Sequence, residues 1–303
     1  MRFPSLGSRV IIRYRLPAGT SPPLTDVVGH LVEAGPTLRV QTKHGDIVDV
    51  GADDVVIMKV LPAAPVRTAD IRNLEHAAAL AWPGLEHRWL DGWLLRAADG
   101  HTHRGNSAVP LGFDADASAL PAIVEWYAER GLAPWLSIPD RLFRLWRGEP
   151  HLDTVVMTCD VAAEAEAADG VTLAAVPDDE WLRVYQRDVP VEVLTAVVDG
   201  EAVFGSIGGA AVGRAAVTAS PDGTRWVGLS AVRVDESQRR HGHARRLCAA
   251  LLAWGAEHGA TRAYLQVLTD NHAAATLFES MGFHIQHHSR YLSAETLQKG
   301  GKW

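Results

Sequence analysis

The stretch Gln238-Arg239-Arg240-His241-Gly242-His243-Ala244 lies between an apolar run over residues 226–234 and an amphipathic segment over residues 244–258. This pattern predicts a strand, a basic turn that contains glycine, and the start of a helix. Such a turn directs several backbone N–H groups at one point, beside the positive end of the helix dipole and next to arginine side chains. The heptapeptide therefore predicts a pyrophosphate site; the alternative is an ordinary strand-to-helix turn with solvated arginines.

A second motif follows the first helix. Residues 261–268 predict another buried strand, and the string Asn271-His272-Ala273-Ala274-Ala275-Thr276-Leu277-Phe278-Glu279-Ser280-Met281-Gly282-Phe283 predicts a helix that ends at Gly282. The two motifs resemble, in this order, the Arg-x-x-Gly-x-Ala signature and the closing motif of the GNAT acetyltransferase superfamily. The resemblance covers roughly residues 170–292. It implies an α/β fold of the α+β GNAT type, a mixed sheet with splayed central strands.

The resemblance also implies a cofactor and a reaction. In this superfamily acetyl-CoA binds together with an amine, and the amine attacks the thioester carbonyl directly. A backbone N–H of the first splayed strand stabilises the developing oxyanion, and this role falls on Val232. The residues that the resemblance assigns to acetyl-CoA are Val232, Val234, Arg239, Arg240, His241, Gly242, His243, Ala244, Asn271 and Phe278.

Two positions depart from the superfamily pattern. Many active members carry a tyrosine in the last motif that protonates the leaving thiolate, and this chain has Phe278 there, which has no proton to give. Many also carry a glutamate as general base on the second splayed strand, where the nearest match is Gln266. We therefore take Tyr291 as the candidate proton donor and His287, or its neighbour His288, as the candidate base.

Histidine pairs also raise the question of a metal. His101 and His103 share one face of an expected strand, and His284 lies close to His287 in the sequence. No cysteine or carboxylate completes either set, so no metal is expected.

Composition limits the remaining classes of function. The chain has 303 residues, which predicts two or three domains, and its net charge of −7 argues against nonspecific nucleic-acid binding. No apolar run approaches the roughly 18–20 residues of a membrane helix, and no apolar signal region follows Met1, so no membrane partner is expected. The two cysteines, Cys159 and Cys248, lie far apart, which indicates reduced thiols and a cytoplasmic protein.

Residues 1–62 read as a small all-β domain. Short β-rich runs over 9–15, 25–32, 37–42, 47–50 and 55–60 alternate with turn signals, which predicts an SH3-like barrel. The pattern resembles the small barrel fused ahead of GNAT domains in some actinobacterial proteins. A stiff linker over residues 61–65 is expected after it. The barrel either binds a peptide, nucleic acid or partner domain, or braces a homodimer.

Residues 66–160 predict a helix over 68–81, a hairpin of strands 89–97 and 101–109 joined at residues 98–100, a helix over 118–130, and strands over 134–138 and 154–159. This order is that of the first half of a GNAT fold, but its strand-to-helix junction has no basic glycine turn. The chain therefore resembles a tandem GNAT protein whose first copy is degenerate, with residues 162–170 as a connector to the copy over 170–292.

The whole sequence predicts an N-acetyltransferase that moves an acetyl group from acetyl-CoA to a primary amine in a ternary complex. The acceptor stays open between a small-molecule amine and an amine of a peptide or protein. The alternative is an acyl-CoA-binding regulatory module with weak or no catalysis, motivated by Phe278 and Gln266. A third interpretation, a nucleic-acid-associated acetyltransferase recruited through the barrel, has the negative net charge against it.

Overall fold

The computed structural model describes residues 3–4, 6–42, 45–61, 66–144, 150–161 and 170–299. The chain divides into two compact units, Met1–Pro65 and Val66–Trp303. The predicted linkers over residues 61–65 and 162–170 lie outside the described residues except for Leu61 and Gly170.

The first unit is a five-stranded antiparallel sheet with the order β4-β3-β2-β1-β5. Its strands are β1 (Arg9–Arg15), β2 (Leu24–Glu33), β3 (Thr37–Thr42), β4 (Ile47–Gly51) and β5 (Val55–Val60). Alternate residues point inward, so that Val10, Ile12, Leu31 and Leu38 are fully buried in one cluster. All five strands that the sequence predicts are present, because turn residues separate them in the sequence.

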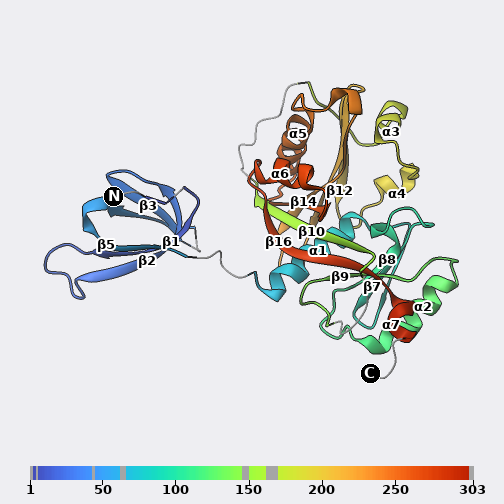
Figure 1. The fold of residues 1–303 in the computed structure, drawn as a ribbon, viewed down its shortest axis with the longest axis horizontal. Helices are drawn as coiled ribbons and strands as arrows, with labels where there is room; N and C mark the ends of the chain where they lie inside the picture. The colour runs from blue at the N-terminus through green and yellow to red at the C-terminus, as the bar shows by residue number, and fades with distance from the viewer. Residues whose placement is uncertain are drawn as a thin grey trace. The chain divides into compact units, whose positions relative to one another are not determined.

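The second unit is built on one mixed sheet of eleven strands, in the order β11-β12-β13-β14-β15-β10-β16-β9-β8-β7-β6 (Figure 1). Its strands are β6 (Glu86–Leu90), β7 (Trp93–Ala97), β8 (Ser107–Pro110), β9 (Trp135–Pro139), β10 (Leu152–Asp160), β11 (Thr172–Ala174), β12 (Glu201–Ile207), β13 (Ala211–Ala219), β14 (Arg225–Val234), β15 (Arg262–Leu268) and β16 (His284–Ser293). Its helices are α1 (Thr68–Ala81), α2 (Leu120–Ala128), α3 (Asp179–Tyr185), α4 (Val191–Thr195), α5 (His243–Glu257), α6 (His272–Glu279) and α7 (Ala294–Lys299).

Two helices connect the two parallel strand pairs of this sheet. β14 and β15 are parallel and α5 joins them, whereas β8 and β9 are parallel and α2 joins them. All other pairings are antiparallel. The same strand–helix–strand unit therefore occurs once on each side of the sheet centre, as the resemblance to a tandem GNAT protein implies.

The last strand of each half crosses into the other half. β10, which follows the first strand–helix–strand unit in the sequence, lies between β15 and β16. The long strand β16 pairs with β10 over most of its length, and its end pairs with β9. The sheet is therefore continuous, and the division into copies over 66–160 and 170–292 remains an interpretation of the sequence.

Helices cover both faces of the β12–β14 part of the sheet (Figure 1). Successive residues of β12 point to opposite faces: Val203 packs in the cluster that contains Leu247 and Leu251 of α5, and Phe204 packs with Trp181 of α3. A Cβ added at Gly255 would lie 2.6 Å from Cβ of Val227, so this glycine lets α5 approach β14 closely. The pattern explains why β13 is buried over almost its whole length.

One predicted hairpin is wrong in its detail. The run over residues 89–97 is broken by a two-residue turn at Asp91-Gly92, with φ of 45° and 76°, and the hairpin is formed by β6 and β7. Such positive φ values suit Asp-Gly in a tight hairpin turn. Residues 101–106 form no strand, because the Asn106 side chain accepts from the backbone of Ala98 and Gly100 and donates to the carbonyls of His101 and Thr102.

Candidate active site

The central feature of the second unit is the separation of β14 from β15. These strands pair over only four residue pairs, from Trp226 with Arg262 to Leu229 with Leu265. Immediately after this point Ala231 takes a φ of 54°, and the register with β13 shifts between Val212 and Arg214. The bulge bends the end of β14 away from β15. The splayed central strands that the sequence predicts are therefore present.

A cavity of about 440 Å³ lies where the strands separate. Its walls come from β14, β15, α6, β16, β10, the α1 end, the loop before β8 and the end of α3. The lining residues are Trp82, Thr102, His103, Arg104, Leu152, Thr154, Tyr185, Arg187, Leu229, Ser230, Ala231, Val232, Arg233, Leu265, Gln266, Val267, Leu268, Asn271, Ala274, Phe278 and Tyr291. The structure thus brings Val232, Asn271, Phe278 and Tyr291 together at one cavity.

The basic turn begins α5 as the sequence predicts. Gly242 is the N-cap of the helix with a φ of 77°, and no side chain caps the first turn. Arg240 also has a positive φ, of 67°, and both residues are exposed. The first N–H groups of a helix have no intrahelical partner, so this end of α5 offers free donors to an anion. Residues 239–242 are exposed and residues 243 and 244 are half-buried, and Arg239 pairs with Glu236 at 3.1 Å.

The remaining predicted contacts are spread along the same side of the sheet. Val234 ends β14 and pairs with Ala211, and it does not line the cavity. Asn271 is the N-cap of α6 and accepts from the backbone N–H of Ala274 at 3.2 Å. Phe278 is buried against Phe283, with ring centroids 5.6 Å apart, so it provides an apolar wall.

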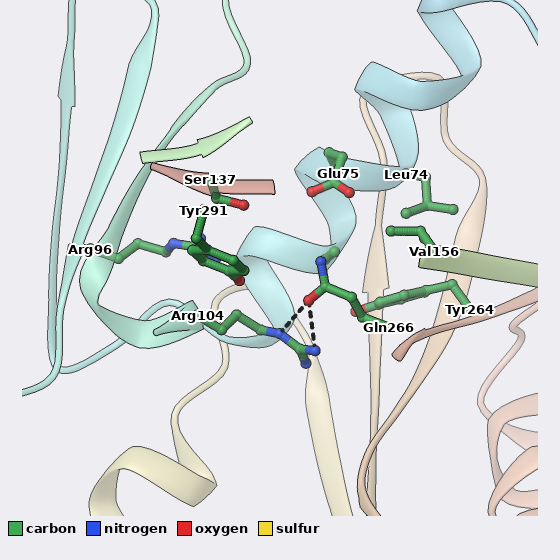
Figure 2. A pocket seen from close by; sticks show the side chains of 10 residues that line it. Leu74, Glu75, Arg96, Arg104, Ser137, Val156, Tyr264, Gln266 and Tyr291 are labelled. Atoms are coloured by element: carbon green, nitrogen blue, oxygen red, sulfur yellow. Dashed lines mark hydrogen bonds between the residues drawn. The ribbon is translucent and has the colours of Figure 1, made fainter. Parts of the chain in front are cut away.

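Gln266 is held in place by an arginine from the other half of the sheet. Arg104 donates from Nε and Nη2 to Gln266 Oε1, at 3.2 and 2.9 Å (Figure 2). Behind this contact lies a smaller cavity of about 20 Å³, whose polar walls include Glu75, Arg96 and Tyr264. That volume is close to the space of one water molecule. Arg104, Gln266 and Tyr291 line both cavities and form the wall between them.

Known proteins share this architecture. The family model "Probable histone acetyltransferase Rv0428c C-terminal" matches residues 68–292, and the model "Rv0428c N-terminal Sm-like domain" matches residues 4–59. Probable histone acetyltransferase Rv0428c of Mycobacterium tuberculosis is 53% identical over 299 residues, which cover 97% of each chain. The chain belongs to this acetyltransferase family.

More distant proteins agree with this assignment. The uncharacterized N-acetyltransferase YobR of Bacillus subtilis is 25% identical over 265 residues, 73% of this chain and 98% of that protein. A solved GCN5-related N-acetyltransferase from Kribbella flavida has a TM-score of 0.54 at 18% identity, over 74% of this chain and 95% of that one. The protein is thus an acetyltransferase in which a small all-β domain precedes the GNAT fold in the sequence. The predicted family and fold class are confirmed.

The two catalytic candidates of the acetyltransferase occupy different environments. Tyr291 is 3% exposed and lines the cavity, and Figure 2 shows its ring beside Arg104 and Gln266. His287 lines neither cavity, because its Nε2 lies 2.8 Å from Glu75 Oε1 and its Nδ1 lies 2.8 Å from Gln286 Oε1. The structure therefore places Tyr291 at the cavity and holds His287 away from it, in buried hydrogen-bonding contact with Glu75.

Several residues of the acetyltransferase site have no signal in the sequence. Glu75 lies in the middle of α1 and is buried against a histidine that follows it by 212 positions. Arg104 lines the cavity from the 3₁₀ turn before β8, and Arg187 lines it from the segment after α3. Only the order of the strands brings these residues together, and a single sequence does not contain that order.

Two general properties complete the description of the acetyltransferase. No helix within the described ranges is long and apolar enough to cross a membrane. Among the same residues, no group of three or more histidine, cysteine, aspartate or glutamate side chains is arranged to hold a metal ion.

Proposed function

We propose that the acetyltransferase moves an acetyl group from acetyl-CoA to a primary amine by direct attack in a ternary complex. The observation that supports this most strongly is the cavity of about 440 Å³ at the point where β14 and β15 separate. From this cavity β14 leads to the uncapped N-terminus of α5. A donor with a diphosphate at one end and a thioester at the other matches these two features.

The residues present fit acetyl-CoA. The N-terminus of α5 has no capping side chain of its own, and a Cβ placed at Gly242 would meet no heavy atom within 4 Å, so an anion has room to approach. Residues 239–244 would hold the diphosphate through backbone N–H groups and the charge of Arg240. Asn271 and the backbone of Val232 would hold the pantetheine arm at the cavity.

The reaction then needs two contributions from the chain. The neutral amine nitrogen forms a bond to the thioester carbonyl carbon and then loses one proton to water. The carbon–sulfur bond breaks, and the sulfur leaves as a thiolate that takes up one proton. The backbone N–H of Val232, which lies in the bulge of β14, stabilises the oxyanion. Tyr291, whose side chain faces the cavity, is the group in place to protonate the thiolate.

Direct transfer is supported by the state of the two cysteines. Cys159 and Cys248 are both buried, and burial raises the pKa of each thiol to about 12. Because the thiolate is the nucleophilic form, neither side chain is suited to carry an acetyl group between the two substrates. The cytoplasmic location expected from these cysteines remains a prediction.

A second candidate function rests on one contact. Arg104 donates two hydrogen bonds to the side-chain oxygen of Gln266, at the position where many superfamily members carry the general base. This contact favours a module that binds acyl-CoA with weak or no catalysis.

Calorimetric titration with acetyl-CoA, followed by assays of thiol release with a panel of primary amines, tests both candidates. Micromolar binding and intersecting double-reciprocal plots are expected for a ternary complex. Parallel plots would contradict direct attack. Binding without thiol release from any amine would support the regulatory module, and absence of binding would contradict both.

A further inference from the structure

A glutamate is buried on the apolar face of α1. Glu75 is 7% exposed and follows Leu74, which is fully buried. Glutamate is rarely buried to this extent without a partner, because removing a carboxylate from water is costly. The partner of Glu75 is His287 of β16, whose Nε2 lies 2.8 Å from Glu75 Oε1. This contact orients the carboxylate and uses one of its two oxygens.

The other oxygen of Glu75 is not tied to a second partner. Glu75 lines the cavity of about 20 Å³, and among the described residues only His287 is recorded in hydrogen-bonding contact with its carboxylate. Arg96 and Arg104 line the same cavity, but their recorded hydrogen bonds go to other acceptors. The two guanidinium charges therefore compensate the carboxylate and leave its second oxygen free to bind water.

The small cavity has the size and the polar groups that one water molecule needs. Its volume of about 20 Å³ holds a single water, which needs several polar partners. The lining side chains with a hydroxyl group are Ser137, Tyr264 and Tyr291, and Figure 2 shows the Glu75 carboxylate pointing from α1 toward Gln266. Burial raises the pKa of Tyr264 to about 12, so this side chain keeps its proton. Of the described residues that line either cavity, Glu75 is the only carboxylate.

Tyr291 links the small cavity to the larger one. Three described side chains line both cavities: Arg104, Gln266 and Tyr291. A guanidinium group has donors only, and a side-chain amide gives up no proton near neutral pH, whereas a hydroxyl group both donates and accepts. Within this shared wall, Tyr291 is therefore the group that can pass a proton from one cavity to the other.

We propose that Glu75 receives the proton that the acceptor nitrogen loses and returns it for the leaving sulfur, acting through Tyr291 and one water in the small cavity. The inference rests on the proposed function, and it supplies the proton acceptor that Gln266 is unable to provide. His287 is a positioning residue in this scheme, because it holds the carboxylate and lines neither cavity.

The proton balance closes within the site. After the bond between nitrogen and the carbonyl carbon forms, the nitrogen gives one proton to water in the larger cavity. That water protonates the Tyr291 oxygen as the Tyr291 proton moves to the water in the small cavity, which protonates Glu75. When the carbon–sulfur bond breaks, the electron pair stays on sulfur, which takes the Tyr291 proton. The Glu75 proton then returns to Tyr291 through the same water, so one proton has moved from nitrogen to sulfur.

The first test replaces the carboxylate with an amide. Glu75→Gln keeps the size of the side chain and an oxygen that accepts from His287, but it takes up no proton. We expect kcat to fall about a hundredfold, with no change in the dissociation constant of acetyl-CoA. Glu75→Asp keeps the carboxylate and should recover most of this loss. Thiol release is measured with a lysine-rich peptide and with phenethylamine as acceptors.

Glu86→Gln is the matched control. It also removes a paired carboxylate, since Arg130 Nε lies 2.8 Å from Glu86 Oε2, and Glu86 lines neither cavity. We expect kcat of this control to equal that of the unchanged protein.

A double variant tests whether Glu75 acts through Tyr291. If the proton passes Tyr291 to reach Glu75, then Glu75→Gln has no further effect once Tyr291→Phe is present. The combined variant should be about as slow as Tyr291→Phe alone, about a hundredfold below the unchanged protein and not about ten-thousandfold. Losses that multiply would overturn the proposed proton path.

The unchanged protein offers a test that does not depend on the folding of a variant. Several protons move together along the path, so the single-turnover rate constant in mixtures of H₂O and D₂O should fall along a curve as the deuterium fraction rises. A straight line, which is typical of one proton in transfer, would overturn the inference.

The outcomes separate the inference from the proposed function. Unchanged kcat in Glu75→Gln would assign the proton to another acceptor, such as His103 of the larger cavity, and would overturn the inference alone. A loss that Glu75→Asp does not recover, or an equal loss in Glu86→Gln, would give Glu75 a structural role and also overturn it. Absence of transfer to every amine by the unchanged protein, despite acetyl-CoA binding, would contradict the proposed function and the inference with it.

Discussion

The two parallel strand pairs of the acetyltransferase have the same frame and different turns. In each, two strands pair briefly and then separate, over four residue pairs in β14–β15 and two in β8–β9. In each, a helix returns the chain between them. The difference lies at the start of that helix, and under the proposed function it decides which half holds the diphosphate of the donor.

A pair of buried arginines shows how closely the frames agree. Arg214 on β13 donates to Ala81 O and to Ser230 Oγ on β14, and Arg96 on β7 donates to Trp82 O and to Ser107 Oγ on β8. Both guanidinium groups thus reach the carbonyl end of α1, where a helix has unpaired acceptors and negative charge. Each half contributes one arginine to the same helix end.

The turns differ in what occupies the helix N-terminus. Gly242 leaves the first turn of α5 without a cap. In the other half Asp116 accepts from Ser118 N–H at 2.7 Å, in the turn of 3₁₀ helix that leads into α2. Trp93 donates to the Asp116 carbonyl, and Arg72 donates to the carbonyls of Leu111 and Gly112. A carboxylate of the chain thus accepts from the first turn of this junction, whereas no side chain does so at the start of α5.

The largest expected effect comes from placing an acidic side chain in the uncapped turn before α5. Gly242→Glu places a carboxylate at the anion site, and we expect the affinity for acetyl-CoA to fall at least about a thousandfold, or about 4 kcal/mol. The control is Gly131→Glu, because Gly131 also has a positive φ, of 64°, and open space around a Cβ, but lies after α2. Calorimetric titration of both variants makes the comparison. Equal affinity of the two variants would remove the diphosphate from residues 239–244.

Next in size is the loss of a buried arginine. Arg214→Met leaves carbonyls of Ala81, Leu194 and Ala196 without their donor, and we expect a loss of about 3 kcal/mol in the free energy of unfolding. Arg96→Met should cost a comparable amount if the two frames are equivalent. Urea unfolding measures both. A cost below about 1 kcal/mol for either would mean that its half of the frame holds the α1 end by other contacts.

The Tyr291 hydroxyl should matter for turnover and not for binding. Tyr291→Phe removes the proton donor that faces the cavity, and we expect kcat to fall about a hundredfold, at the lower end for a general acid because a thiolate is a good leaving group. The dissociation constant of acetyl-CoA, measured by calorimetry, should not change. Unchanged kcat would exclude this hydroxyl from the mechanism.

The elements were predictable where periodicity and turn chemistry agree. All five strands of the first unit, α1 and the α5 turn follow from local patterns, since Gly242 and Gly282 mark the helix ends directly. The hairpin at Asp91-Gly92 carries the same kind of signal, but the continuous apolar run around it concealed the turn. Local patterns do not contain the exchange of β10 and β16 between the two halves, because that exchange depends on long-range pairing.

The residues proposed to hold the donor could be named from the sequence, whereas the residues across the cavity from them could not. The sequence motifs include the residues proposed to hold the donor, because these lie on consecutive elements: Val232, residues 239–244 and Asn271. Arg104 reaches Gln266 across 162 positions, and Glu75 reaches His287 across 212. These contacts depend on the order of the strands in the sheet. Residues that lie so far apart in the sequence form no motif that a single sequence shows.

The smallest effect should come from removing the Asp116 cap in the turn before α2. Asp116 is exposed, and hydrogen bonds from the Ser118 hydroxyl and backbone N–H lower the pKa of its carboxyl group. Asp116→Ala should therefore lower Tm by about 2 °C at pH 7, a modest loss typical of a missing cap in a unit of this size. A carboxyl group whose pKa is lowered by folding stabilises the protein above its unfolded pKa, about 3.9, and this contribution is lost as the pH falls through the folded value. The difference in Tm between the two proteins should accordingly vanish in acid. Calorimetry with acetyl-CoA should still give one site per chain, because Trp93 and Arg72 keep this turn closed without the carboxylate; a second site would mean that Asp116 alone separates the two halves.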